Sequence, residues 1–295
     1  MAKKKSKVTD GVETYFACGS LKAKASAAAI QSAYKIEVRF LGGLNTAQKN
    51  AFKAAADRWS KVIVGDLPSV MVGGEVIDDL LIEAQGVPID GPGKILGQAG
   101  PTNLRPASAG VNAFLPAKGI MSFDTADLAQ MQADGTLLDV ITHEMGHVIG
   151  IGTVWSQKGL LVGAGTSNPT FTGANAKREY GVLKGTAPRA VPVENTGGPG
   201  TQDSHWRESV FKNELMSGFI AAPNNPISKL TVASLKDLGY VVDMSAAEPY
   251  SLPNLMALAE SGASLVRSET ELGQMLPILS PKVLPDESLD ITPTT

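Results

Sequence analysis

Residues 136–149 read TLLDVITHEMGHVI, and this stretch decides how the rest of the chain is interpreted. Its apolar residues recur every three or four positions, which is the spacing of one face of a helix. The apolar stripe consists of Leu138, Ile141, Met145 and Val148. The pattern therefore predicts a helix that packs the side carrying Leu138 and Ile141 against a core and presents its other side to a cleft.

Both ends of this helix carry signals that are typical of helix termini. Thr136 and Asp139 have the T-x-x-D spacing of a capping pair, which can satisfy the free backbone N–H groups of the first turn. Gly150 and Gly152 follow the last apolar residue. Glycine readily adopts the left-handed conformation with which many helices end, so Gly150 is predicted as the helix-ending residue.

His143, Glu144 and His147 form the pattern H-E-M-G-H within this helix. Residues i and i+4 lie one turn apart on the same helical face, so the two imidazoles point in the same direction. Two imidazoles placed in this way can bind one Zn²⁺, an ion that prefers tetrahedral nitrogen and sulfur ligands. Glu144 lies beside them, where its carboxylate can reach a metal-bound water without binding the metal itself.

A catalytic zinc site needs a third protein ligand and keeps one position open for water. Thr153 occupies the position at which a compact H-E-x-x-H-x-x-G-x-x-H motif has its last histidine, and threonine is not a credible zinc ligand. The remaining histidine of the chain is His205, which makes it the main candidate. Because two histidines and one glutamate also form a known catalytic zinc set, the rival ligands are Glu179, Glu194 and Glu208.

Two carboxylates flank His205 in the sequence TQDSHWRE at 201–208, namely those of Asp203 and Glu208. A zinc-bound imidazole usually donates its other N–H group to an oxygen atom, so one of these carboxylates can orient the His205 ring. The alternative is that each of them forms a salt bridge with a nearby lysine or arginine.

The composition excludes several classes of protein. With 295 residues, 43% of them hydrophobic, the chain can bury a large core, and its net charge of −3 gives no general attraction to nucleic acid or an anionic membrane. The single cysteine, Cys18, excludes an internal disulfide, and no apolar run approaches the roughly 20 residues of a membrane helix. The lysines near residue 1 are not followed by the apolar stretch of a Sec signal peptide, so we expect a cytoplasmic protein or export by another route.

The remaining patterns predict an α+β protein with a twisted mixed sheet that is packed against helices. The expected strands are 34–41, 79–85, 95–99 and 119–124. The other expected helices are 47–63, with Thr46 as its cap, and 228–239. Residues 150–200 contain eleven glycines and little periodicity, which predicts a long, loop-rich region.

The segment HEMGHVIG at 143–150 resembles the H-E-x-x-H-x-x-G start of the metzincin metalloprotease motif. The long Gly-rich stretch before HWRESVFKNELMSG at 205–218 is similar to the leishmanolysin family, in which an insertion separates the second and third zinc histidines. The resemblance is strong over 136–155 and 198–220 and fainter over 34–64 and 229–240.

This resemblance implies one catalytic zinc ion and the residues around it. The implied metal ligands are His143, His147 and His205. Glu144 would be the general base, and Met216 would lie in the turn beneath the metal. Gly150 would let the chain swing back under the metal.

The resemblance also divides the chain and leaves one cysteine to be explained. The implied regions are a flexible lead or short pro-segment at 1–30, an N-terminal catalytic subdomain with the zinc helix at 31–150, a loop-rich C-terminal subdomain at 151–250, and a Pro- and Ser-rich tail at 251–295. Leishmanolysins are rich in cysteine, so their disulfide framework is absent here. Cys18 is either an idle thiol or the zinc-blocking group of a latency segment.

The implied function is a zinc-dependent endopeptidase that cleaves internal peptide bonds of proteins through a zinc-bound water activated by Glu144. Tyr180 or Tyr240 can help to stabilise the oxyanion. The strand at 119–124, expected at the edge of the sheet, can pair with an extended substrate. The alternatives are a metal-holding binding or adhesion module without catalysis, and a structural zinc domain, which would need four protein ligands.

Overall fold

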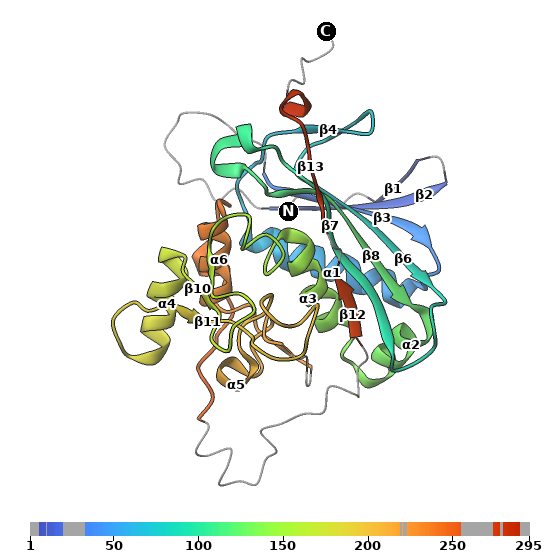
Figure 1. The fold of residues 1–295 in the computed structure, drawn as a ribbon. Coiled ribbons are helices and arrows are strands. Elements are labelled where there is room, and N and C mark those ends of the chain that lie inside the picture. The colour runs from blue at the N-terminus through green and yellow to red at the C-terminus, as the bar shows by residue number, and fades with distance from the viewer. Residues whose placement is uncertain are drawn as a thin grey trace.

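The fold is built around one eight-stranded mixed sheet with helices packed against it (Figure 1). The computed structural model describes residues 6–9, 11–19, 33–218, 220, 223–254, 274–277 and 280–289. The strand order is β1-β2-β3-β6-β8-β7-β12, and β13 also pairs with β7. This architecture confirms the predicted α+β class and its mixed sheet.

Along the central strands β3 and β6, buried residues alternate with less buried ones, so one face of these strands packs against the core. β3, β6 and β8 are parallel neighbours, whereas β2 is antiparallel to β3 and β7 is antiparallel to β8. The strands of this sheet are β1 Ser6–Thr9, β2 Val12–Cys18, β3 Lys35–Gly42, β6 Leu80–Val87, β7 Ile95–Leu104, β8 Pro116–Asp124, β12 Gln274–Pro277 and β13 Lys282–Val283. The four strands that we predicted therefore all exist.

One prediction about this sheet is wrong. The stretch 119–124 lies in β8, which pairs with β6 on one side and with β7 on the other, so it is an interior strand. β7 lies beyond it, and the outer side of β7 pairs with the C-terminal strands β12 and β13. Because every backbone group of an interior strand already has partners on both sides, β8 offers no edge to an extended peptide.

Two long helices, α1 Thr46–Val62 and α3 Leu137–Ile149, lie against the same face of the sheet (Figure 1). The Trp59 ring on α1 is fully buried, and its Nε1 donates to the backbone oxygen of Thr142 on α3 at 2.9 Å. The helix predicted at 47–63 is thus confirmed, but its cap is Asn45 rather than Thr46. Asn45 forms a full capping box with Gln48, because each side chain accepts from the other residue's backbone N–H.

The environment of α3 differs from the predicted one. Nearly every residue of α3 is buried, and Leu138, expected on the core side, is 38% exposed. Thr136 and Asp139 do not form a capping pair. The Asp139 carboxylate instead accepts from the backbone N–H groups of Asn224 and Asn225 and contacts the guanidinium of Arg58 on α1. A tertiary contact has therefore replaced the local one.

The region from 150 to 200 contains more regular structure than we predicted. It holds helix α4 Ala174–Lys184 and a small sheet of β9 Leu161–Val162, β10 Thr170–Phe171 and β11 Val191–Pro192. Helix α6 Lys229–Leu238 confirms the helix predicted at 228–239, and a short helix α5 Glu208–Phe211 precedes it. The remaining elements are β4 Val70–Val72, β5 Glu75–Ile77, α2 Thr125–Asp134 and the 3₁₀ helices η1 Ala107–Asn112, η2 Met244–Ala246 and η3 Asp286–Leu289.

The two ends of the chain add strands to the main sheet. β2 lies within the predicted lead at 1–30 and pairs with β3 from Glu13 to Cys18, so this part is not a flexible lead. β12 and β13 lie within the predicted tail. Residues 20–32 and 255–273 lie outside the described residues. The subdomain boundaries at 150 and 250 remain predictions. Within the described ranges, no helix is both long and apolar enough to cross a membrane.

Candidate metal centre

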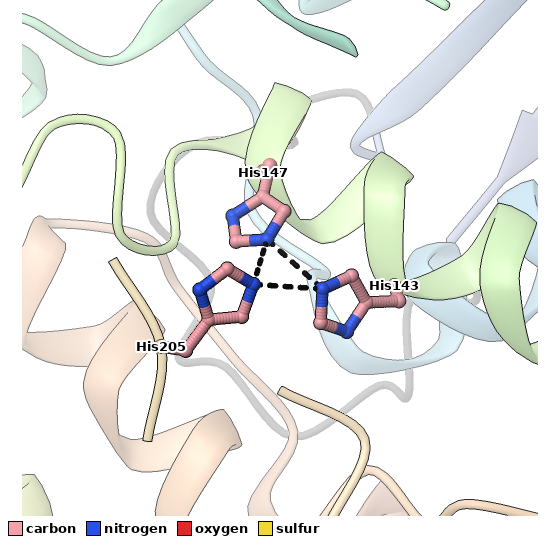
Figure 2. Close-up of side chains that lie close together, drawn as sticks. All are labelled: His143, His147 and His205. Atoms are coloured by element: carbon pink, nitrogen blue, oxygen red, sulfur yellow. Dashed lines mark hydrogen bonds between the residues drawn. The ribbon is translucent and has the colours of Figure 1, made fainter. Parts of the chain in front are cut away.

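The three histidines of the chain come together at one point (Figure 2). His143 and His147 project from α3, and His205 reaches them from the segment before α5. Their Nε2 atoms form a triangle in which His143 and His205 are 3.0 Å apart, His143 and His147 3.1 Å, and His147 and His205 2.9 Å. All three side chains are buried.

The opposite nitrogen of each ring fixes its orientation. Nδ1 of His143 donates to the backbone oxygen of Leu215 at 2.6 Å, and Nδ1 of His147 donates to that of Ile151 at 2.8 Å. Nδ1 of His205 donates to the backbone oxygen of Thr201 at 2.9 Å. A carbonyl oxygen can only accept, so each Nδ1 carries the proton of a neutral ring.

The three Nε2 atoms therefore turn their lone pairs toward one another, and such atoms cannot hydrogen-bond among themselves. A cation between them removes this repulsion, and nitrogens about 3 Å apart fit around one Zn²⁺ with ligand distances of about 2.0–2.1 Å. These residues thus fit a single metal ion. Among the described residues, Cys18 is exposed and does not belong to this group.

Burial keeps the imidazoles in the form that binds metals. Burial lowers the pKa of His143 to about 3, with a further contribution from the nearby His147. It lowers the pKa of His147 to about 4 and that of His205 well below its ordinary value. Since only a neutral imidazole has a free lone pair, no proton has to leave these rings at neutral pH before an ion binds.

Glu144 lies on α3 next to His143 and is buried without a charged partner. Within the described residues, no lysine or arginine pairs with its carboxylate. Burial alone raises the pKa of Glu144 to about 8, because a carboxylate without water or a cation favours its protonated form. A nearby cation would favour the ionised form again, so the charge of Glu144 depends on what occupies the three-histidine site.

The chain turns sharply after α3, and this turn shapes the site. Gly150 ends the helix with φ of 119°, and its N–H donates to the backbone oxygens of Gly146 and His147. Gly152 has φ of 76°, and a Cβ there would lie 2.0 Å from the backbone oxygen of Ser204. The segment that carries His205 can approach α3 because this position is a glycine.

Met216 lies directly beneath the helix. Its side chain is fully buried, and its sulfur would lie 2.7 Å from a Cβ placed on Gly146. The backbone oxygen of Met216 accepts from the N–H of Trp206 at 2.9 Å, next to His205. Met216 therefore connects the underside of α3 to the segment that carries His205.

We expect a Gly146→Val variant to lower the free energy of unfolding by about 1–3 kcal/mol, because overfilling a packed core costs this amount. The added atoms would meet the Met216 side chain and the Trp59 ring, whose Cζ2 lies 3.0 Å from the position of a Cβ. Urea denaturation measures the change. Leu138→Gln at an exposed position of the same helix is the control, with an expected change of about 0.5 kcal/mol or less. Equal stability of both variants would contradict this packing.

The family model of leishmanolysin matches residues 109–259, which include α3, all three histidines and Met216. This chain belongs to the leishmanolysin family. It is 28% identical over 136 residues to the leishmanolysin homolog of Crithidia fasciculata, over 42% of this chain and 20% of that protein. It is 30% identical over 145 residues to leishmanolysin of Leishmania donovani, over 45% of this chain and 24% of that protein.

A leishmanolysin-like peptidase of Caenorhabditis elegans is 38% identical over 66 residues, which make up 22% of this chain and 9% of that protein. The matches thus span a quarter or less of the length of these relatives. The relatives are named as leishmanolysins or as a leishmanolysin-like peptidase.

Two of the three rival third ligands, Glu194 and Glu208, have partners elsewhere. Both carboxylate oxygens of Glu194 accept from backbone and hydroxyl groups. Glu208 lies 3.9 Å from the Nζ of Lys212, which is the salt-bridge alternative. Glu179 lies on α4. These glutamates are absent from the group of side chains that meet at the three imidazoles among the described residues.

Asp203 and Tyr240 form hydrogen bonds with backbone groups outside the three imidazoles. His205 is oriented by the backbone oxygen of Thr201 and the hydroxyl of Ser204, so Asp203 does not take this role; its carboxylate accepts from the N–H of Gly165. The buried Tyr240 hydroxyl donates to the backbone oxygen of Ile149 and so binds the last residue of α3.

The acceptors that fix the three rings were not predictable from the sequence, because they are mostly backbone oxygens. Any residue type supplies such an oxygen, so no side-chain pattern can predict it. Gly146 and Gly152 were visible in the sequence, but their role depends on chain segments far from them. The sequence predicts Glu194 only as a rival ligand, whereas its burial and its hydrogen bonds place it in the support of the His205 segment.

Proposed function

We propose that this chain is a zinc-dependent endopeptidase that hydrolyses internal peptide bonds of proteins. The observation that carries the proposal is the convergence of three neutral imidazoles at their Nε2 atoms, two of them on the helix that also carries the buried Glu144. Membership of the leishmanolysin family supports it. The proposed metal ligands are His143, His147 and His205, with Met216 as the methionine of the turn and Gly150 as the helix-ending glycine.

A zinc ion bound at this site would lower the pKa of its bound water and would polarise the scissile carbonyl. Glu144 accepts one proton from the attacking water while the water oxygen bonds to the carbonyl carbon. Glu144 then passes this proton to the amide nitrogen, and the C–N bond breaks to leave an amine and a carboxylic acid. The buried surroundings of Glu144 favour this exchange, since they destabilise its charged form and make it a better base.

The chain's own backbone holds the rings in place during these steps. The oxygens of Leu215, Ile151 and Thr201 each bind one Nδ1–H, which fixes the neutral tautomer. Such hydrogen bonds also make the opposite nitrogen more basic and prevent the ring from turning. Pairing of a substrate with 119–124 forms no part of the proposal, because that strand is interior.

We expect the purified protein to degrade casein and to lose this activity when a zinc chelator is added. Activity should return when zinc is added in excess of the chelator, because the neutral rings can bind the ion again. Release of acid-soluble peptides measures the reaction. A chelator-sensitive zinc content without any cleavage of casein or of a peptide library would instead favour a binding module. Cleavage that survives complete removal of zinc would contradict the proposal.

A further inference from the structure

Glu194 is a buried carboxylate without a cation. The residue is 2% exposed, and in the described part of the chain no lysine or arginine forms an ion pair with it. Such a charge is costly unless hydrogen-bond donors surround it. The Glu194 carboxylate therefore depends on hydrogen-bond donors in its surroundings.

The donors come from two segments on either side of His205. Oε1 of Glu194 accepts from the N–H of Asn195 at 2.9 Å and from the N–H and hydroxyl of Thr196 at 3.0 and 2.7 Å. Oε2 accepts from the N–H of Glu208 at 2.7 Å. The carboxylate thus joins Asn195 and Thr196 to Glu208, the residue that begins α5.

The backbone of Glu194 also binds the segment that carries His205. Its N–H donates to the backbone oxygen of His205 at 2.9 Å, and its own oxygen accepts from the N–H of Asp203 at 2.9 Å. Asp203, His205 and Glu208 are therefore all tied to one residue. Of these three contacts, the one from the Glu208 N–H to the carboxylate is charge-assisted, and such hydrogen bonds are shorter and stronger than neutral ones.

We propose that Glu194 is a positioning residue that holds His205 at the metal centre. The inference rests on the proposed function in that zinc is the ion concerned. His143 and His147 need no such device, because one helix sets their separation. His205 lies 58 residues beyond His147, so its place depends on how its own segment is held. The carboxylate holds that segment at Glu208, and the backbone of Glu194 holds it at Asp203 and His205. Together these contacts keep the third Nε2 within reach of the other two.

A second buried glutamate provides a comparison. Glu214 is fully buried, and its carboxylate accepts from the N–H of Met216 and from the hydroxyls of Ser228 and Thr231. It therefore holds the methionine turn against α6 and makes no hydrogen bond with the segment 203–208. Loss of either carboxylate should destabilise the fold, but the Glu194 carboxylate is the one bonded within the segment that carries the third ligand, so its loss should weaken zinc binding more.

The test compares Glu194→Gln with Glu214→Gln, and with Glu179→Gln on α4 as a control. Glutamine is nearly isosteric, but its NH₂ group must face one of the N–H donors that now meet an oxygen. Zinc affinity is measured by competition with a chelator, and thermal unfolding is measured on the metal-free proteins. The visible absorption of the Co²⁺-loaded proteins reports whether all three imidazoles still bind the ion.

We expect Glu194→Gln to weaken zinc binding about 10–100-fold, the usual effect of losing a residue that supports a ligand. Its Co²⁺ spectrum should change and its zinc affinity should fall further than that of Glu214→Gln, whereas Glu179→Gln should keep the wild-type spectrum. Thr196→Val, which removes one donor and is milder, should weaken zinc binding by a smaller factor if Glu194→Gln fails to fold. If Glu194→Gln and Thr196→Val both keep the zinc affinity and the Co²⁺ spectrum of the wild type, the inference is overturned.

Failure of the inference is distinguishable from failure of the proposed function. If the wild type binds zinc and cleaves casein while Glu194→Gln binds zinc equally well, only the positioning role is wrong. If the wild type binds zinc, Glu194→Gln loses it and neither protein cleaves any substrate, the positioning role holds and the endopeptidase is wrong. If the wild type binds no zinc, both are overturned.

Discussion

A Glu144→Gln variant is expected to bind a full equivalent of zinc and to cleave casein about 10²–10⁴-fold more slowly than the wild type, which is the usual contribution of a general base. Glutamine fills nearly the same space, so the buried helix around it should remain intact. It cannot accept a proton from water at neutral pH, and this is the function that we assign to Glu144. Initial rates with casein and zinc content by atomic absorption, measured on the same sample, check both parts.

The control for this variant is Glu179→Gln, which makes the same chemical change on α4. It should retain the activity and the zinc content of the wild type. Full activity of Glu144→Gln would refute the general-base role, even if the metal were bound. Loss of zinc together with activity would show that Glu144 supports the site rather than the proton transfer.

A His205→Ala variant is expected to weaken zinc binding by at least about 100-fold, because a direct ligand is worth no less than the residues that support one. The two remaining imidazoles of His143 and His147 would hold the ion with half of a tetrahedral ligand set. Proteolysis should fall with the zinc content. Atomic absorption after dialysis against a weak chelator measures the loss.

All three histidines of the chain lie in the site, so no histidine elsewhere can serve as a control. Gln202→Ala is suitable instead, since it truncates a side chain of the same segment and leaves the ring of His205 in place. This variant should bind zinc like the wild type. An unchanged zinc content in His205→Ala would mean that another donor, such as a glutamate, completes the ligand set.

The helices with strong apolar periodicity were predictable, and their end signals were less so. α1, α3 and α6 lie where the sequence predicted them. The capping pair predicted at Thr136 and Asp139 does not exist, because Asp139 is bound to Asn224, Asn225 and Arg58. A carboxylate takes the donors that the tertiary structure offers, and those lie outside any local window of sequence.

The position of a strand within the sheet was also not predictable from the sequence. The pattern at 119–124 correctly predicted a strand but wrongly predicted an edge. Alternation shows which side chains are buried and says nothing about which strands lie beside a given one. In the same way, the short α4 and the small sheet of β9, β10 and β11 arise in a Gly-rich region whose composition predicts loops.

The sequence by itself determined the pair of histidines on α3 and the glutamate beside them, because a helix has a fixed pitch and four residues make about one turn. It also limited the third ligand to one remaining histidine or a few glutamates. Only the tertiary structure decided that His205 meets the pair, with the Nε2 atoms of His147 and His205 2.9 Å apart across 58 residues. The reason is that this contact depends on two left-handed glycines, a buried glutamate and several backbone oxygens, and chain segments so distant in sequence acquire a fixed separation only when the whole core packs.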